Sequence, residues 1–246
     1  QVKLLVVDHP QDTEIYTPTM TKFAQPYPFK VYTIRDAKAP ISAVDENGAD
    51  ILPIISKVDR VYTHGEDFHW DTVTLDLGDL SGAKQIKLLL NAWVDWPLVP
   101  GVAARYMTEE YRARVEVINE AGEWEDVSIE EPLGLPQALP RTHVIDITDW
   151  FKTDDYRIRI HYWEKVPIDY ITFDTSEDEE FSITELEPTS VNLHWKGVAR
   201  EFLPDGKRPH IADYYTTVNA SGFERFIGNF TRYGDVLPLL TQVDDK

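Results

Sequence analysis

A candidate ligand-binding surface follows from the alternation of residues 156–163. Apolar and polar side chains alternate there, and successive side chains of a β-strand point to opposite faces. One face would carry Arg157, Arg159, His161 and Trp163. Two other strand candidates have similar polar sets, at Arg112, Arg114 and Glu116 and at Lys87, Asn91, Trp93 and Asp95. If these strands are neighbours, one sheet face combines cations, carboxylates and indoles.

Sugar-binding sandwiches use such a mixture, because flat indoles stack on sugar rings and charged groups form bidentate hydrogen bonds with hydroxyls. The candidate ligand-binding residues are Trp93, Asp95, Arg157, Arg159, His161 and Trp163. The alternative is structural: residues 186–246 or a neighbouring subunit would cover the face, and its charges would pair with one another.

Catalytic and metal chemistry have less support in the sequence. A glycosidase needs two carboxyls about 5–9 Å apart in a cleft, whereas adjacent acids such as Glu109 and Glu110 point to opposite faces of a strand. The chain has no cysteine and no glycine-rich phosphate loop or nucleophile elbow. The nearest approach to a metal-ligand set is His64, Asp67 and His69, and the acidic run 174–180 lacks the spacing of a calcium loop. We predict no catalytic residue, no metal and no cofactor.

Charge excludes further classes of partner. The chain has 43 acidic and 24 basic residues, which give a net charge of -19. This field repels nucleic acid and anionic membrane surfaces. No apolar run approaches the ~20 residues that cross a bilayer, so we expect no membrane insertion. Cationic and neutral ligands remain open.

The elements that must position these residues are short strands. Residues 72–77 alternate, residues 85–96 are almost continuously apolar as in a strand covered on both faces, and residues 60–175 lack sustained helical periodicity. We therefore predict an all-β fold, with an antiparallel jelly-roll or β-sandwich over residues 61–175. Residues 1–60 would form a small β extension, and residues 176–246 a second one that packs on the sandwich or on a partner.

The strand order resembles that of galactose-binding-like jelly rolls. Four blocks also resemble the C-terminal β-rich region of multidomain extracytoplasmic proteins with FG-GAP repeats, tetratricopeptide repeats or ASPIC/UnbV-type domains: ISAVDENGADILP (41–53), LLNAWVDW (89–96), YRIRI (156–160) and TRYGDVLPLL (231–240). That resemblance implies an extracellular, periplasmic or cell-surface location, a longer parent protein and no established catalytic residue.

The leading hypothesis from the sequence is a non-catalytic binding or structural module of an exported multidomain protein or multisubunit assembly. It would act through contacts with a protein partner or through self-assembly, and the apolar residues 236–240 motivate this choice. The alternative is a carbohydrate-binding module that uses Trp93, Trp163 and their neighbours. A glycoside hydrolase-type domain is the third hypothesis. Exposure of the two indoles separates the first two, and a cleft with facing carboxylates would favour the third.

Overall fold

The computed structural model describes residues 2–17, 21–22, 25–26, 29–65, 69–94, 113–128, 136–218 and 231–241. They belong to two compact units: Asp12–Glu179 forms the sandwich unit, and Gln1–Gln11 with Glu180–Lys246 forms the ribbon unit. Strands account for 41% of the structure and helices for 5%, so the predicted all-β class is confirmed. Among the described residues, no helix has the length and apolar character needed to cross a membrane.

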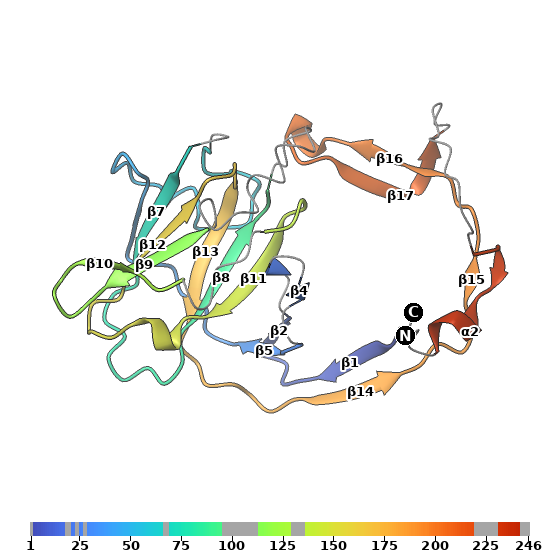
Figure 1. Ribbon diagram of the computed structural model, residues 1–246, viewed down its shortest axis with the longest axis horizontal. Helices are drawn as coiled ribbons and strands as arrows, with labels where there is room; N and C mark the ends of the chain where they lie inside the picture. Colours follow the sequence, from blue (N-terminus) through green and yellow to red (C-terminus); the bar gives the residue numbers. More distant parts are fainter. Residues whose placement is uncertain are drawn as a thin grey trace. The chain divides into compact units, whose positions relative to one another are not determined.

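Two antiparallel sheets make up the sandwich unit (Figure 1). The five-stranded sheet has, in spatial order, β10 (Trp124–Asp126), β9 (Arg114–Ile118), β12 (Arg157–Tyr162), β7 (Asp71–Asp76) and β6 (Ser42–Val44). The three-stranded sheet has β11 (Arg141–Asp146), β8 (Lys87–Ala92) and β13 (Ile168–Asp174). A short 3-10 helix, Thr148–Trp150, follows β11. The predicted sandwich is therefore present, and its jelly-roll connectivity stays a prediction.

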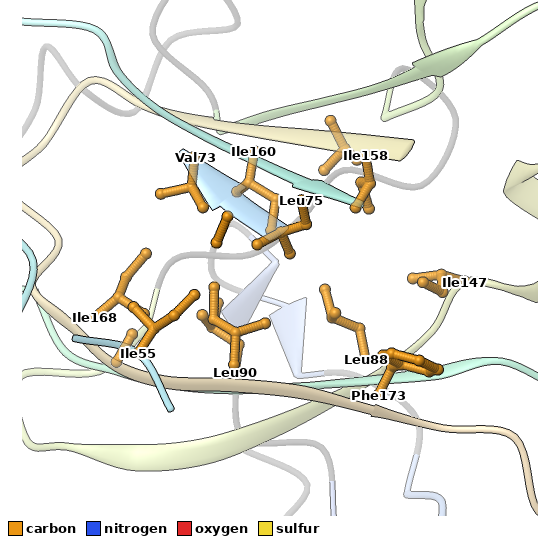
Figure 2. Packing of buried hydrophobic residues seen from close by; sticks show 14 of the residues in the cluster. Ile55, Val73, Leu75, Leu88, Leu90, Ile147, Ile158, Ile160, Ile168 and Phe173 are labelled. Carbon is orange, nitrogen blue, oxygen red and sulfur yellow. The ribbon is translucent and has the colours of Figure 1, made fainter. Parts of the chain in front are cut away.

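The core lies between the two sheets. Ile158, Ile160 and Tyr162 of β12 are buried while the residues between them are more exposed. Figure 2 shows Leu75 and Ile160 of the five-stranded sheet pointing toward Leu88 and Leu90 of the three-stranded sheet. The alternation of β12 thus has a physical cause: one face closes the core and the other is left for polar residues.

The three-stranded sheet is covered on its second face as well. Leu89 and Val144 pack there against Tyr32 and Ile34, which explains why every residue of β8 is buried. The covering layer includes two small hairpins: β2 (Glu14–Tyr16) pairs with β5 (Tyr32–Ile34), and β3 (Thr21–Lys22) pairs with β4 (Gln25–Pro26).

One buried cation lies under this layer. The ammonium of Lys87 is fully buried and donates hydrogen bonds to the Thr33 carbonyl oxygen at 2.6 Å and to Asp178 Oδ1 at 3.1 Å. Asp174, also buried, accepts hydrogen bonds from the backbone amides of Arg35 and Asp36. The hydrogen bonds to Asp174 join segments about 140 residues apart in the chain, and β6 pairs with β7. Of the predicted extension, residues 1–60, the part from Asp12 onward therefore belongs to the sandwich unit, and the part before it to the ribbon unit.

The ribbon unit consists of paired strands. β1 (Leu4–Asp8) pairs with β14 (Ser182–Leu186), β15 (Asn192–Leu193) with β18 (Gly234–Asp235), and β16 (Val198–Phe202) with β17 (Ile211–Val218); a 3-10 helix (Pro204–Gly206) and a short helix α2 (Leu237–Leu240) complete it. Val236 is buried, and its amide donates to the Val191 carbonyl oxygen at 3.1 Å, whereas Leu239 is 62% exposed. The apolar segment 236–240 is thus partly docked within its own unit.

Candidate functional site

The outer face of the five-stranded sheet collects the polar and aromatic residues of four strand segments. In the register of the sheet, Arg159 lies between Glu116 and Thr74, and His161 lies between Arg114 and Thr72. We define the Trp–Arg face as Trp70, Thr72, Thr74, Arg114, Glu116, Trp124, Arg157, Arg159, His161 and Trp163. Except for Arg157, which is more exposed, all of these side chains are partly exposed.

Hydrogen bonds fix the middle of the Trp–Arg face. The two ring nitrogens of His161 contact Thr72 Oγ1 at 2.9 Å and Glu116 Oε2 at 3.1 Å. The same Glu116 oxygen lies 3.9 Å from a guanidinium nitrogen of Arg159. One carboxylate is therefore shared by two side chains of β12: it is hydrogen-bonded to His161 and lies near the positive charge of Arg159.

Guanidinium groups lie on the indoles at both ends of the Trp–Arg face. The Arg159 guanidinium carbon is 3.9 Å from the centre of the Trp124 ring, and that of Arg114 is 4.6 Å from the centre of the Trp70 ring. Trp70 and Trp163 meet edge to face with ring centres 5.4 Å apart. Such cation–π and aromatic contacts orient the rings, so the indoles are ordered before any ligand arrives.

Arg157 is held beside the face by its own carboxylate. It forms a bidentate pair with Asp155, with nitrogen–oxygen distances of 2.8 and 2.6 Å. These hydrogen bonds keep the pKa of Asp155 below its usual value and raise that of Arg157. The guanidinium carbon of Arg157 is 5.8 Å from the Trp124 ring centre. This cation is already paired, so it adds a rigid planar edge to the face with little net charge.

Four of the six predicted site residues are together on the Trp–Arg face: Arg157, Arg159, His161 and Trp163. Trp93 is elsewhere, because β8 belongs to the three-stranded sheet. Its indole is 4% exposed and packs against Tyr62 with ring centres 6.1 Å apart. Asp95 and Arg112 lie outside the described residues. The structure therefore brings the strand of Arg157 next to that of Glu116, as expected, and separates both from Trp93.

The sequence-based set omitted Trp70 and Trp124. Trp124 begins β10 and pairs with Ile118 of β9. The residue of β9 before Ile118, Val117, pairs with Ile158 of β12. Trp70 comes immediately before β7 and two residues before Thr72, so it continues the outward alternation. Both have the spacing of outward-facing residues, but this signal is informative only when the strand pairing is known.

A separate cleft of about 530 Å³ opens beside β6 and β7. Its described lining includes His64, His69, Asp71, Asp45 and Asp50. Asp45 accepts backbone hydrogen bonds from residues 47 and 49, and Asp50 accepts one from residue 52. The Asp45 carboxylate thus stabilises the turn at residues 45–49, and the Asp50 carboxylate the turn that follows. Asp67, the third member of the metal-ligand set considered from the sequence, lies outside the described residues. No group of three or more potential metal ligands is found in the described part of the chain.

Comparisons with known proteins give no guidance on the function of this site. No family model, no curated protein and no solved structure matches the chain. The interpretation of the Trp–Arg face therefore depends on its own geometry.

Proposed function

We propose that the chain is a non-catalytic binding module and that its Trp–Arg face binds a neutral carbohydrate. One observation carries the proposal: three indoles, held by arginine and aromatic contacts, flank a row in which Glu116 is hydrogen-bonded to His161 and lies 3.9 Å from the Arg159 guanidinium. Indoles contact the apolar C–H faces of sugar rings, and planar charged groups bind pairs of hydroxyls. Their existing contacts reduce the entropy lost on binding.

Charge favours a neutral sugar over an acidic one. The guanidinium of Arg159 lies near Glu116, and that of Arg157 is paired with Asp155, so these two cations of the Trp–Arg face have nearby carboxylates. The whole chain carries a net charge of -19, which slows the approach of polyanions. A polyhydroxylated neutral ligand experiences neither repulsion nor a loss of these pairs.

The test is depletion of the protein from solution by insoluble cellulose, xylan, mannan and chitin, followed by calorimetry with soluble fragments of any polymer that binds. Trp124→Ala should weaken binding about tenfold, since one aromatic contact is worth roughly 1 kcal/mol or slightly more. Trp195→Ala is the matched control, because Trp195 is 58% exposed in the ribbon unit and should leave binding unchanged. Absence of binding to the whole panel, or equal losses in both variants, would contradict the proposal.

A second candidate function is self-assembly through the ribbon unit, which a different observation favours. All five residues of β14 are exposed, and Tyr215 of β17 is 94% exposed. Within the described residues, each of the pairs β1–β14 and β16–β17 is a two-stranded sheet, so the outer edge of each strand pairs with no further strand. Edges of this kind readily pair with strands from another chain. A second copy of this chain presents the same unpaired strand edges.

Sedimentation velocity across a range of protein concentrations tests self-assembly. Because a net charge of -19 opposes association, the mean mass should increase more steeply at 0.5 M salt than at low salt. Tyr215→Lys should abolish that increase, whereas Tyr233→Lys, a control at a second exposed tyrosine (64%), should preserve it. A monomer at every concentration and salt would exclude this second function.

A further inference from the structure

The indoles of the Trp–Arg face form two groups at opposite ends of β12. Trp124 pairs with Ile118 of β9. Because Val117 pairs with Ile158 and β9 is antiparallel to β12, Ile118 is level with residue 157, at the beginning of β12. Trp124 is therefore level with the beginning of β12 as well. At the other end, Trp163 follows the last residue of β12 and meets Trp70. The face therefore has one aromatic station at Trp124 and a second at Trp70 and Trp163.

The register of the sheet gives the separation of the stations. Trp124 is level with residue 157, and Trp163 is six residues further along β12, which corresponds to roughly 20 Å along an extended strand. Trp124 is also two strands away across the sheet, because β9 lies between β10 and β12; this adds an offset of roughly 10 Å. A single pyranose ring is several times smaller than this separation and contacts only one station.

Between the stations the face offers hydrogen-bonding groups. Thr74 pairs in register with Arg159, and Thr72 with His161. Glu116 lies on the neighbouring strand opposite Arg159. Glu116 of β9 and His161 of β12 thus lie near the diagonal between the two stations, with Arg159 beside them and the two threonines one strand further on, on β7. These groups can bind the ring hydroxyls of successive sugar units.

We infer that the Trp–Arg face binds an extended neutral oligosaccharide that crosses the sheet diagonally, with Trp124 of β10 under one end and Trp70 and Trp163, beyond the end of β12, under the other. This inference rests on the proposed carbohydrate function and specifies the form of the ligand: an internal stretch of a polymer. When one end of a long ligand binds at one station, its other end is held close to the second station, so the effective concentration there is high. Affinity therefore rises with chain length and levels off once the ligand reaches both stations.

Calorimetry with a length series tests the inference. The probes are cello-, xylo-, manno- and chito-oligosaccharides from the monomer to the hexamer, measured against the wild-type chain and the variants Trp124→Ala, Trp163→Ala and Trp195→Ala. The hexamer of the bound series should bind at least tenfold more tightly than the dimer. Trp124→Ala and Trp163→Ala should each remove this gain while weak dimer binding at the remaining station persists. Trp195→Ala should behave as the wild type.

The possible failures are distinguishable. If monomer and hexamer bind equally, or if only one of the two station variants affects the hexamer, the two-station inference is wrong while the carbohydrate function stands. If no sugar of any length binds the wild type, the proposed function fails as well. Because an alanine variant can lose folded structure, Trp124→Phe and Trp163→Phe serve as a second pair: they keep an aromatic ring and should retain at least part of the length dependence.

Discussion

Two buried titratable side chains of the sandwich unit should give its stability opposing dependences on pH. Glu164 is 2% exposed. Burial raises its pKa to about 7, although the backbone amides of Glu164 and Trp163 act in the opposite direction. His143 is 1% exposed, and burial lowers its pKa to about 4. Burial thus favours the neutral form of each side chain. Glu164 resists deprotonation as the pH rises, and His143 resists protonation as the pH falls.

The magnitudes follow from the two pKa values. Glu164 has an ordinary pKa of 4.5, so its contribution to stability is complete below pH 4.5 and is lost, by roughly 3 kcal/mol, as the pH rises toward 7. His143 has an ordinary pKa of 6.5. Its contribution is complete above pH 6.5 and is lost, by roughly 3 kcal/mol, as the pH falls toward 4. Between pH 4.5 and 6.5 the two slopes, each about 1.4 kcal/mol per pH unit, cancel.

Urea denaturation monitored by tryptophan fluorescence from pH 4.5 to 7.5 measures both terms. Relative to the wild type, Glu164→Gln should gain stability with rising pH, because only the His143 slope remains. His143→Gln should lose stability over the same range, because only the Glu164 slope remains. Differences from the wild type at each pH remove the contributions of other carboxyls. A Glu164→Gln curve parallel to that of the wild type would refute the reasoning for this residue, and a parallel His143→Gln curve would do so for the histidine.

Three further outcomes are expected. Lys87→Met should lower the free energy of unfolding by about 3 kcal/mol, because the buried Asp174 carboxylate loses the ammonium 4.0 Å away. Lys84→Met, at an exposed ion pair, should leave the free energy of unfolding nearly unchanged. Chemical denaturation measures both, and equal effects would contradict the role of burial. Val236→Ala should accelerate hydrogen exchange of the amide of residue 236, because it removes the buried side chain beside the hydrogen bond to Val191. Leu239→Ala, at an exposed site, should leave that exchange rate unchanged. Both rates are measured by NMR. Excess EDTA should shift the melting temperature by less than a few degrees, and a large drop reversed by calcium would reveal a structural metal.

Local pattern was sufficient to predict the faces of single strands. The alternation of residues 156–163 identified the outward Arg157, Arg159 and His161, and the continuous apolar run at residues 85–96 indicated a strand covered on both sides. Both predictions use only the period of a strand and the cost of leaving apolar side chains in water. These quantities depend on the residues of one segment, so a single sequence contains them.

Strand pairing could not be predicted in the same way. Alternation fixes which side chains share a face of their own strand, but contacts distant in sequence decide which strands become neighbours. Trp93 and Trp163 have comparable patterns, yet their strands lie in different sheets. Lys87 was grouped with the ligand-binding polar residues, but the Thr33 carbonyl and Asp178 bury and pair it. Those partners lie 54 and 91 residues away, and no local pattern indicates them.

The central claim, that a carbohydrate lies across the Trp–Arg face, is tested most directly by the indole N–H signals in a ¹⁵N–¹H NMR spectrum. Single Trp→Phe variants assign the signals, and the hexasaccharide of the polymer that binds is then added. We expect the signals of Trp70, Trp124 and Trp163 to shift together along one binding curve. The signals of Trp93 and Trp150, which are 4% and 7% exposed, should stay in place. A bound ligand that shifts only Trp195, or that leaves every indole signal unchanged, would contradict the claim.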